Sequence, residues 1–495
     1  MKTLEEILDF TNRGTREIIN DLKLKTLPVP SWEKTSKAYY PQYHKIYSDT
    51  LGRKDKKRSD GVYEEAARLA IGLERLLAKR MTEFTFSLPV KRQYDNIDSE
   101  VRQAIARAME AVYANAHINN ENVKRGLAYY AACEICTVWY ATKKPNTLYG
   151  VESQWKLKCK TYSPMDGYEL YPLFDEYDDM VAMSLSYVKK VGQQDVEYFE
   201  TFTADRRYKW KRNSQSEDGW ESVINETKED GEAVPGKEIK LMKIPAIYMW
   251  RNEPVFTEDM SRLRENIEYT LSRNSDTVAY NSAPVLKVSG EVEGQEEKGE
   301  TQRIFNVENG GDVSYVSWDQ STDANKDHIL NLLKFYWMQG QMPDVSFDNM
   351  LKLGSIGYDA RQTLFTDAHL RVGDEAGSWY EFLEREANVV KAFLKLVEPA
   401  WEKEIDNVPV KHIITPFIQR DETSEIERRM KANGGKAIES QLESITKFGQ
   451  SKDPQATLEQ IQLEEKKSQE ARANSLTSMF EDKSEDENDD DNDEE

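Results

Sequence analysis

Apolar positions between Thr257 and Ala279 recur at intervals of three and four residues, which predicts a helix with one narrow apolar stripe. The stripe consists of Met260, Leu263, Ile267 and Leu271. Thr257 is a favourable N-cap, and Glu258 and Asp259 place negative charge near the positive end of the helix dipole. A narrow stripe suits a helix that packs against similar helices better than one buried in a broad core.

A strand-rich insert and a second helix follow this stripe. The runs Gln302 to Val307 and Val313 to Trp318 flank Asn309-Gly310-Gly311-Asp312, a turn sequence that predicts a β-hairpin. Ala324 to Gln339 is almost continuously apolar, so we expect a helix that is covered on most of its sides. The Gly-containing segment Met342 to Gly357 closes the region as a loop. Two helices around a small β module allow a chain to cross a thickness of protein, form an exposed head and cross back.

The segment Met1 to Asp60 predicts an irregular arm that starts with a short helix near Leu4. Pro28, Pro30 and Pro41, with aromatic residues around them, indicate an extended segment that docks on another part of the protein. The arm ends in a basic loop, for which simple solvation is favoured over a nucleic-acid contact. The basic residues are Arg53, Lys54, Lys56, Lys57 and Arg58.

Three helices and then a strand-rich region are predicted next. The helices are Tyr63 to Lys79, Asp98 to Ala116 and Asn122 to Thr137. After Trp155 the apolar period changes to two, which indicates strands. They include Met180 to Tyr187, Val196 to Thr203 and Arg206 to Arg212. In the last of these, basic residues alternate with Tyr208 and Trp210, so a nucleic-acid contact stays open, although a half-buried strand is the simpler interpretation.

The C-terminal third is predicted to be mainly helical. A long helix covers Glu375 to Trp401, with Pro399 expected to disturb its last turn, and a shorter helix precedes it at Arg361 to Arg371. Val408 to Ile414 reads as a strand. Glu425 to Lys431 and Gly434-Gly435 follow this strand, and their resemblance to a known protein family implies a further helix, a glycine turn and more helix.

Charge is concentrated at the C-terminus. The chain has 495 residues and a formal net charge of -22, and Glu481 to Glu495 alone contains eleven acidic residues and one lysine. Such a run predicts a disordered tail. A protein of this charge is a poor tight binder of nucleic acid, because that affinity depends on neutralising phosphates. An acidic wall is nevertheless compatible with DNA that slides through a channel without adhering to it.

Motifs for enzymatic chemistry are weak in this sequence. Cys133 and Cys136 form a CxxC inside an apolar run read as helix, where core packing is favoured over zinc or redox chemistry. Gly434-Gly435-Lys436 lacks the remaining residues of a phosphate-binding loop, and the five histidines lack zinc-site spacing. We therefore expect no catalytic residue, no cofactor and no metal. Scattered acidic residues keep a metal-dependent nuclease open as an alternative: Asp344, Asp348, Asp359 and Asp367.

The order of these elements resembles the portal proteins of tailed bacteriophages. Ile244-Pro245-Ala246-Ile247-Tyr248 is similar to that family's lead-in to its first stem helix, and Pro284-Val285-Leu286-Lys287-Val288 is similar to its step into the clip. Pro343-Asp344 and Gly354-Ser355-Ile356-Gly357 resemble the stretch around its tunnel loop. This sequence departs from the family pattern there, because Ile356 separates the serine from the glycine.

The resemblance implies an α+β portal architecture that forms a ring, with a helical stem and crown, a mixed α/β wing and a small β-rich clip. The implied divisions are an N-terminal arm (1–60), the first part of the wing (61–256), a stem helix (257–281), the clip (282–323), a second stem helix (324–341), the tunnel loop (342–358), the long helix and second part of the wing (359–420), the crown (421–480) and the acidic disordered tail (481–495).

The resemblance also implies roles for three groups of residues. The tunnel loop would face DNA with Ser346, Asn349, Lys352 and Ser355. The stem charges, expected to pair between neighbouring subunits, are Arg262, Arg264, Glu265 and Glu268. The clip would dock partners through Arg303, Asn309, Asp312 and Tyr315.

The implied assembly is a homo-oligomeric ring, expected to be a dodecamer, at the portal vertex of the virion capsid after assembly in the host cytoplasm. Its expected partners are double-stranded DNA, the terminase large subunit, a head-completion adaptor, and the major capsid and scaffolding proteins. No membrane contact is expected, because no apolar run is long enough to span a bilayer. Two alternatives stay open: another self-assembling virion or scaffold protein, and a DNA-processing enzyme.

Overall fold

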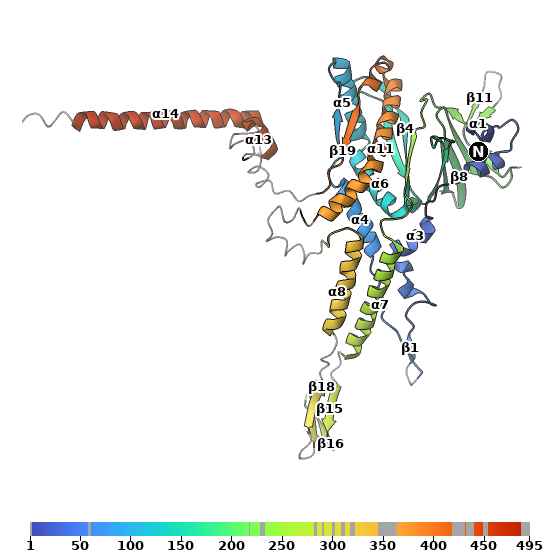
Figure 1. Ribbon diagram of the computed structural model, residues 1–495, viewed down its shortest axis with the longest axis vertical. Helices are drawn as coiled ribbons and strands as arrows, with labels where there is room; N and C mark the ends of the chain where they lie inside the picture. The colour runs from blue at the N-terminus through green and yellow to red at the C-terminus, as the bar shows by residue number, and fades with distance from the viewer. Residues whose placement is uncertain are drawn as a thin grey trace, which may run out of the picture. The chain divides into compact units, whose positions relative to one another are not determined.

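The computed structural model describes residues 2–57, 61–216, 218–227, 233–281, 285–289, 292–298, 302–307, 312–316, 322–344, 363, 365–417, 431, 440–448 and 454–486. The chain divides into two compact units, Met1–Ile418 and Gln419–Glu495, which are described separately (Figure 1). Helices and mostly antiparallel strands are both abundant, which confirms the predicted α+β class.

The N-terminal segment is more helical than predicted. It contains α1 (Leu4–Ile7), α2 (Thr15–Leu22), α3 (Trp32–Tyr39) and the short 3₁₀ turns η1 (Pro41–Tyr43) and η2 (Lys45–Tyr47). The short helix predicted near Leu4 is confirmed by α1, whereas the irregular, extended arm was a wrong prediction for α2, α3 and the two 3₁₀ turns. Apolar side chains of α1 and α2 are buried against aromatic residues of a distant β-sheet, which supplies the stabilisation that helices this short lack in isolation.

Helices α4 (Leu73–Phe86), α5 (Glu100–Asn115) and α6 (Ile118–Ala132) build the centre of the first unit. The helix predicted at Tyr63 to Lys79 is wrong in its first half, because residues 65–72 are not helical. The helix predicted to reach Thr137 ends at Ala132, since Cys133 adopts a left-handed conformation with φ of 68° and a strand begins directly after it.

The first sheet has the order β14-β4-β5 and is antiparallel. It consists of β4 (Glu134–Asn146), β5 (Ser153–Tyr162) and β14 (Ala246–Trp250). The long helix α11 (Thr366–Val397) lies beside this sheet (Figure 1). Two helices were predicted for this stretch, but residues 366–371 are continuous with the rest of α11. The helix ends at Val397 and not at the predicted Trp401, and Pro399 disturbs the last predicted turn as expected, because residues 399–401 form a 3₁₀ turn.

The second sheet has the order β10-β9-β8-β7-β6, and β13 also pairs with β9. Its strands are β6 (Tyr168–Phe174), β7 (Met180–Val191), β8 (Gln194–Phe202), β9 (Arg206–Arg212), β10 (Trp220–Ser222) and β13 (Lys237–Glu238). All three strands predicted by alternation are present. Tyr208 and Trp210 are buried on one face of β9 while Lys209 and Lys211 alternate with them, which confirms the half-buried strand. Shorter strands pair nearby: β1 (Lys56–Lys57) with β2 (Tyr63–Glu64), and β11 (Asn225–Thr227) with β12 (Ala233–Pro235).

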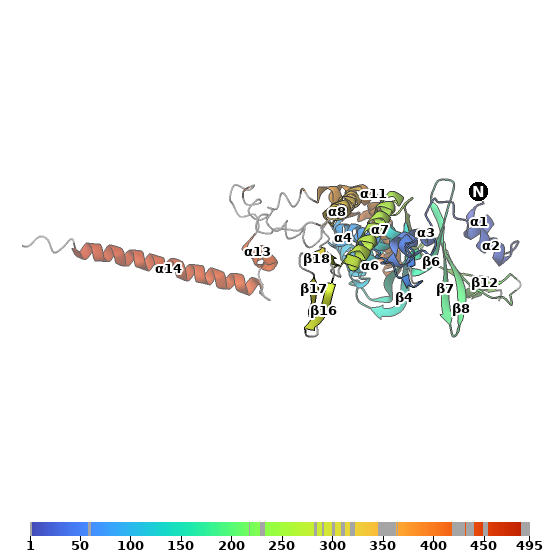
Figure 2. The same ribbon diagram turned by 90° about the horizontal axis from the view of Figure 1, so that it is seen from below.

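Helices α7 (Glu258–Asn281) and α8 (Thr322–Gln339) run side by side, as Figures 1 and 2 show from two directions. Both helices were predicted. The expected covering of α8 holds for one side only, because Leu332 and Tyr336 are buried whereas Leu330 and Met338 are largely exposed in the single chain.

The strands between these helices pair differently from the prediction. They are β15 (Val285–Ser289), β16 (Val292–Lys298), β17 (Gln302–Val307) and β18 (Asp312–Val316). The predicted hairpin of β17 with β18 is wrong, because β17 pairs with β16 and β18 pairs with β15. The physical reason is the helix pair: β15 follows α7 and β18 precedes α8, so the adjacent helix ends bring these two strands together.

The second unit contains α13 (Gln441–Phe448) and α14 (Pro454–Asp486). Helix α14 continues into the segment predicted to be disordered, since residues 481–486 are helical; glutamate and lysine are good helix formers and no glycine or proline interrupts them there. Of the helix predicted at Glu425 to Lys431, only Lys431 lies within the described residues. In the described parts of the chain, no helix is both long and apolar enough to cross a membrane.

A buried histidine lies on a two-stranded ribbon at one end of the first unit. This ribbon pairs β3 (Lys91–Tyr94) with β19 (Val410–Ile413), which confirms the strand predicted near residue 410 and places His412 opposite Arg92. Burial lowers the pKa of His412 to about 4, and the positive charge of Arg92 acts in the same direction.

We expect the free energy of unfolding to decrease as the pH falls from about 6.5 towards about 4. In this window the unfolded chain binds a proton on His412 and the folded chain does not, so protonation favours unfolding, by at most about 1.4 kcal/mol per pH unit. The variant His412→Gln should show a smaller slope in chemical denaturation followed by tryptophan fluorescence. If the free energy of unfolding changed equally with pH in both proteins, His412 would not be the source of the pH dependence.

Candidate functional site

A buried network of charged side chains anchors the start of α7 to the rest of the first unit. Arg264 donates from Nε to Glu74 Oε1 of α4 at 2.9 Å and from Nη1 to Glu268 Oε2 at 3.0 Å. Glu268 Oε1 lies 2.6 Å from Nδ1 of His44. All four side chains are almost completely buried. The helix is therefore held by charges that solvent does not screen.

The protonation of His44 follows from its two partners. Its Nε2 lies 2.9 Å from the carbonyl oxygen of Ala38, which can only accept, so Nε2 carries a hydrogen. Its Nδ1 faces a carboxylate oxygen, so a proton also lies between His44 and Glu268. The imidazole therefore joins the segment before α4 to α7 through both of its nitrogens.

Glu74 has a carboxylate oxygen without a hydrogen-bond partner among the described residues. Its Oε1 also accepts from the hydroxyl of Ser261 at 3.0 Å, whereas its Oε2 has no hydrogen-bond partner among the described residues. Burial raises the pKa of Glu74, and the adjacent Arg264 partly opposes that shift. The hydroxyl of Tyr336 on α8 is another buried group that lacks a partner within the described chain.

An extended segment, residues 65–72, is fastened along α7 by a regular series of hydrogen bonds. The backbone N–H groups of Ala67, Leu69 and Ile71 donate to side chains of α7, each at 2.8 Å. The acceptors are Asp276, Ser272 and Glu268 in that order. Two residues of extended chain span roughly 6.6 Å and four residues of helix span roughly 6 Å, so the two repeats stay in step over this distance. These bonds explain why residues 65–72 are not helical.

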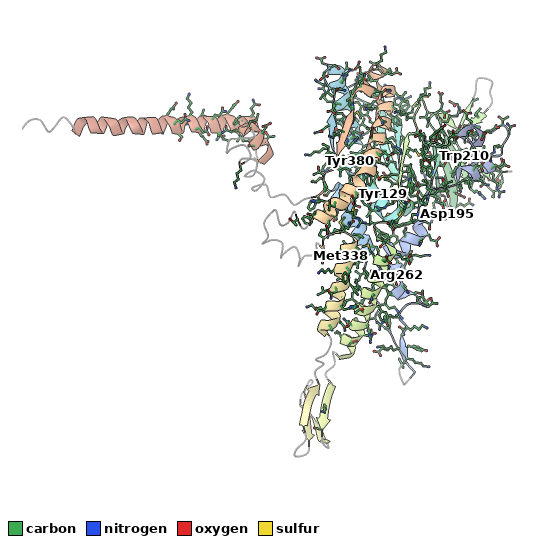
Figure 3. The ribbon with its side chains drawn as sticks, in the orientation of Figure 1. Tyr129, Asp195, Trp210, Arg262, Met338 and Tyr380 are labelled. Atoms are coloured by element: carbon green, nitrogen blue, oxygen red, sulfur yellow. The ribbon has the colours of Figure 1, made fainter. Side chains whose placement is uncertain are left out.

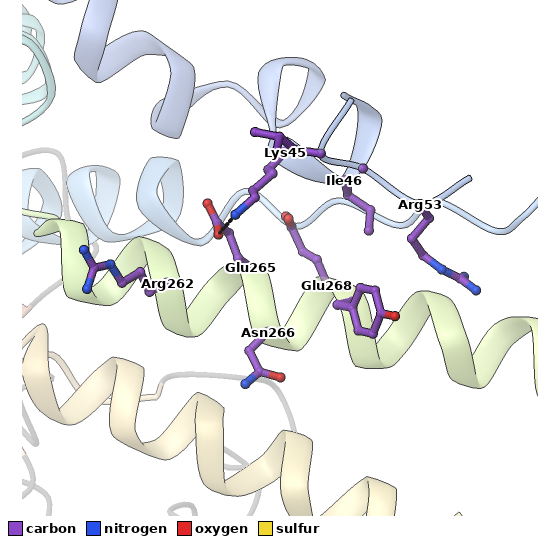
Figure 4. A pocket seen from close by; sticks show the side chains of 10 residues that line it. Lys45, Ile46, Arg53, Arg262, Glu265, Asn266 and Glu268 are labelled. Carbon is purple, nitrogen blue, oxygen red and sulfur yellow. Dashed lines mark hydrogen bonds and ion pairs between the residues drawn. The ribbon is translucent and has the colours of Figure 1, made fainter. Parts of the chain in front are cut away.

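A groove of about 390 Å³ lies between α7 and the N-terminal segment (Figure 4). Lys45 reaches across it to Glu265, with 3.3 Å between Nζ and Oε2. Arg53 closes one end by pairing with Asp276 at 2.6 Å. Arg262 also lines the groove, and within the described part of the chain its side chain pairs with Glu258 and Asp259, one turn earlier on α7.

The structure separates the four predicted stem charges into two classes. The side chain of Arg264 is 3% exposed and that of Arg262 is 69% exposed. Arg262 is labelled in Figures 3 and 4. Arg264 and Glu268 are already paired inside this chain, so the predicted pairing of these two residues between neighbouring subunits has no support from the single chain. Arg262 and Glu265 lie at the surface, so for these two that role stays a prediction.

Most of the other predicted site residues lie outside the part of the chain that the structure describes. Ser346, Asn349, Lys352, Ser355 and Asn309 lie outside the described residues. The backbone of the remaining three is described: Arg303 on β17, and Asp312 and Tyr315 on β18. Asp312 pairs with Ser289, and Tyr315 pairs with Leu286.

Two members of the network, His44 and Glu74, were missed by sequence reasoning. Glu74 carried a signal, because it stands between Leu73 and Leu77 in a helix whose apolar face is buried, where a charge needs a partner. His44 carried no such signal, since its partner Glu268 is far away in the sequence and the contact exists only after folding.

The cysteines support the core-packing interpretation. Cys133 and Cys136 are buried, and Cys136 lies in β4 rather than in the helix that was expected. Burial raises the pKa of the Cys133 thiol to about 12 and raises that of Cys136 further, so both remain neutral thiols rather than thiolate ligands. Over the described residues, no group of three or more histidine, cysteine or acidic side chains is arranged to hold a metal ion.

The variant Arg264→Met should lower the free energy of unfolding by about 3–5 kcal/mol, because it leaves Glu74 and Glu268 buried without their counter-charge. Arg262→Met is the matched control two residues away on the same helix, and we expect no measurable change in unfolding. Urea denaturation of both variants measures the difference. Equal stabilities of the two variants would show that the buried network does not hold α7 in place.

Comparison with known families adds a match over most of the chain. The family described as phage portal protein, SPP1 Gp6-like, matches residues 31–471. A search of curated proteins gave no match. The matched region includes α3, the extended segment, α7, α8, the four strands between those helices, and α11. This chain therefore belongs to the phage portal protein family of the SPP1 Gp6-like type.

Proposed function

We propose that this chain is the repeating subunit of a ring at one capsid vertex, through which double-stranded DNA enters and leaves the phage head. Membership of the portal family implies a capsid-associated, ring-forming protein. The passage of DNA, the contacts with the terminase large subunit and a head-completion adaptor, and the dodecameric number are the finer parts of this proposal.

The observation that carries the proposal is the uncovered apolar side of α8. Leu330, Phe335 and Met338 are 52%, 49% and 63% exposed in the single chain, although they belong to one of the most apolar helices of the protein. Met338 is labelled in Figure 3. Their neighbours Leu332 and Tyr336 are buried. An exposed apolar helix face of this kind marks an interaction site, and a neighbouring copy in a ring is the partner we infer.

The parts of the fold receive roles in this proposal. Helices α7 and α8 form the stem, the strands β15–β18 form the clip, and the sheets with α5, α6 and α11 form the wing. The segment 342–358 is the tunnel loop in this proposal, with Lys352 as its basic side chain. Residues 345–358 of it lie outside the described residues. The buried network around Arg264 supports this arrangement, because it fixes the direction in which α7 leaves the wing.

DNA passage agrees with the charge of the protein. The net charge of -22 opposes tight phosphate binding, which a translocating channel must avoid. Surface ion pairs such as Lys45 with Glu265 contribute on the order of 0–1 kcal/mol each, so ring stability must come from buried apolar surface.

We expect the double substitution Leu330→Asp with Met338→Asp to abolish ring formation. Each apolar side chain buried at an interface contributes about 1.5–3 kcal/mol, and a carboxylate there is costly to bury. Negative-stain electron microscopy and solution mass measure the outcome. Val188→Asp, at an exposed apolar position on β7, is the control that should leave rings intact. Unchanged rings in the double variant would rule out this helix face as the subunit interface, and a monomer that cuts DNA would overturn the portal function.

Replacement of residues 285–316 by a short glycine-serine linker should leave rings intact and abolish DNA packaging. The strands pair only with one another among the described residues, so their removal spares the helices on either side. Electron microscopy for rings and an in vitro packaging assay separate the two effects. Loss of rings in this variant would instead assign the β15–β18 module to assembly.

A further inference from the structure

Strand β4 has a free edge next to the place where β14 begins. Strand β14 pairs with β4 only from Glu134 to Val138, whereas β4 continues to Asn146. The last contact is the N–H of Trp139, which donates to the carbonyl of Pro245 at 2.9 Å. Backbone groups alternate between the two edges of a strand, so the N–H and C=O groups of Ala141 and Lys143 point towards the same side as those of Trp139. No described strand pairs with them there.

An apolar pocket lies directly beside this edge. Its volume is about 430 Å³, and Tyr140 and Ala141 of the free stretch form part of its wall. The rest of the wall is mainly apolar and includes Trp155, Leu157, Pro245, Phe393 and Leu396. Trp155 and Leu396 are partly exposed, although both side chains are large and apolar. The pocket is therefore open and able to receive a side chain from outside.

The surroundings of the pocket are positively charged. Lys237 and Lys240 line it, and Lys143 and Lys144 continue the free stretch of β4; all four are exposed. None of these lysines has an ion-pair partner within the described residues, in a protein of net charge -22. Glu238 is the one acidic side chain in the described wall, and the charge of Arg207 is taken up by Glu200.

We propose that this surface is a docking site for an extended, acidic segment of another protein. The segment adds to β4 as a strand in line with β14, places an apolar side chain in the pocket and brings carboxylates to the four lysines. Strand addition supplies backbone hydrogen bonds, and the pocket supplies selectivity for the side chain. Exposed strand edges are normally protected, so an unprotected edge beside an apolar pocket indicates a binding role.

The chemistry of the pocket distinguishes a protein segment from nucleic acid. Lysines alone would also suit the phosphates of DNA. Duplex DNA, however, presents no apolar group that fills a concave site of this size, and it cannot pair with a strand edge. An acidic segment with one large apolar side chain satisfies the edge, the pocket and the lysines together. The inference goes beyond the proposed function and does not require a ring.

Fluorescence anisotropy with the purified full-length protein tests this site. The probes are a panel of labelled peptides, each roughly six residues long, a typical strand length, in which aspartate or glutamate alternates with valine around one central phenylalanine or leucine. We expect saturable binding. Substitution Lys237→Glu with Lys240→Glu should weaken it by at least about tenfold, because it reverses the charge around the pocket. Lys189→Glu with Lys190→Glu, on the exposed end of β7, is the charge-matched control and should have little effect.

Two further variants test the edge and the pocket separately. Ala141→Pro removes the outward-facing N–H from a position where an edge strand tolerates proline, and Leu396→Asp places a charge in the pocket from the surface of α11. Each should weaken binding by at least about tenfold. Circular dichroism confirms that each variant is folded. If Ala141→Pro does not fold, the loss of peptide binding by Leu396→Asp tests the site alone.

Modified probes determine whether the binding mode is the one proposed. Methylation of alternate backbone nitrogens of the peptide should abolish binding, since it removes the donors that pair with β4. Equal binding by the methylated peptide would overturn strand addition, and equal binding after the Lys237 and Lys240 reversals would overturn the acidic partner. Failure of every peptide in the panel, or binding of a short duplex DNA in preference to all of them, would overturn the proposal as a whole.

Discussion

The buried contact between Arg264 and the two carboxylates of Glu74 and Glu268 determines where α7 lies. A charge inside a protein is expensive unless it is paired and hydrogen-bonded, so few positions of this helix satisfy all three groups at once. His44 extends the constraint to the N-terminal segment through both of its ring nitrogens. The direction of α7 is thereby fixed by groups from three separate parts of the chain.

The extended segment before α4 depends on the same helix. Its alternate N–H groups meet acceptors placed one turn apart along α7, because the repeat of an extended chain and that of a helix turn nearly coincide. Helix α8 then packs along α7 and leaves its other apolar side open. One side of the helix pair is therefore completed inside the chain, and the other side is open in the single chain. The proposed ring rests on this difference between the two sides. The free edge of β4 is similar, because β4 is paired along one edge within the chain and partly open along the other.

Local patterns in the sequence were sufficient for elements whose stabilisation is local or repetitive. The stripe on α7, the apolar run of α8, the alternation in β7 to β9 and the disturbance of the long helix at Pro399 were all predicted. The order of these elements also carried the resemblance to portal proteins, which the family match over residues 31–471 confirmed. Long amphipathic patterns are reliable because many residues contribute to the same periodicity. Single charged residues have no such support, so Arg264 and Arg262 looked equivalent in the sequence.

The sequence by itself determined the α+β class, the helix pair with its strand-rich insert, and the family. Only the tertiary structure decided which residues in those elements are paired inside the chain. It ended α6 at Cys133, kept residues 65–72 extended, and joined β15 to β18. Each of these outcomes depends on partners that are distant in sequence, such as Glu268 for His44 and for the N–H of Ile71. A periodic pattern identifies the face of an element that will be buried, but a long-range contact is specified only when the chain has folded and both partners are in place.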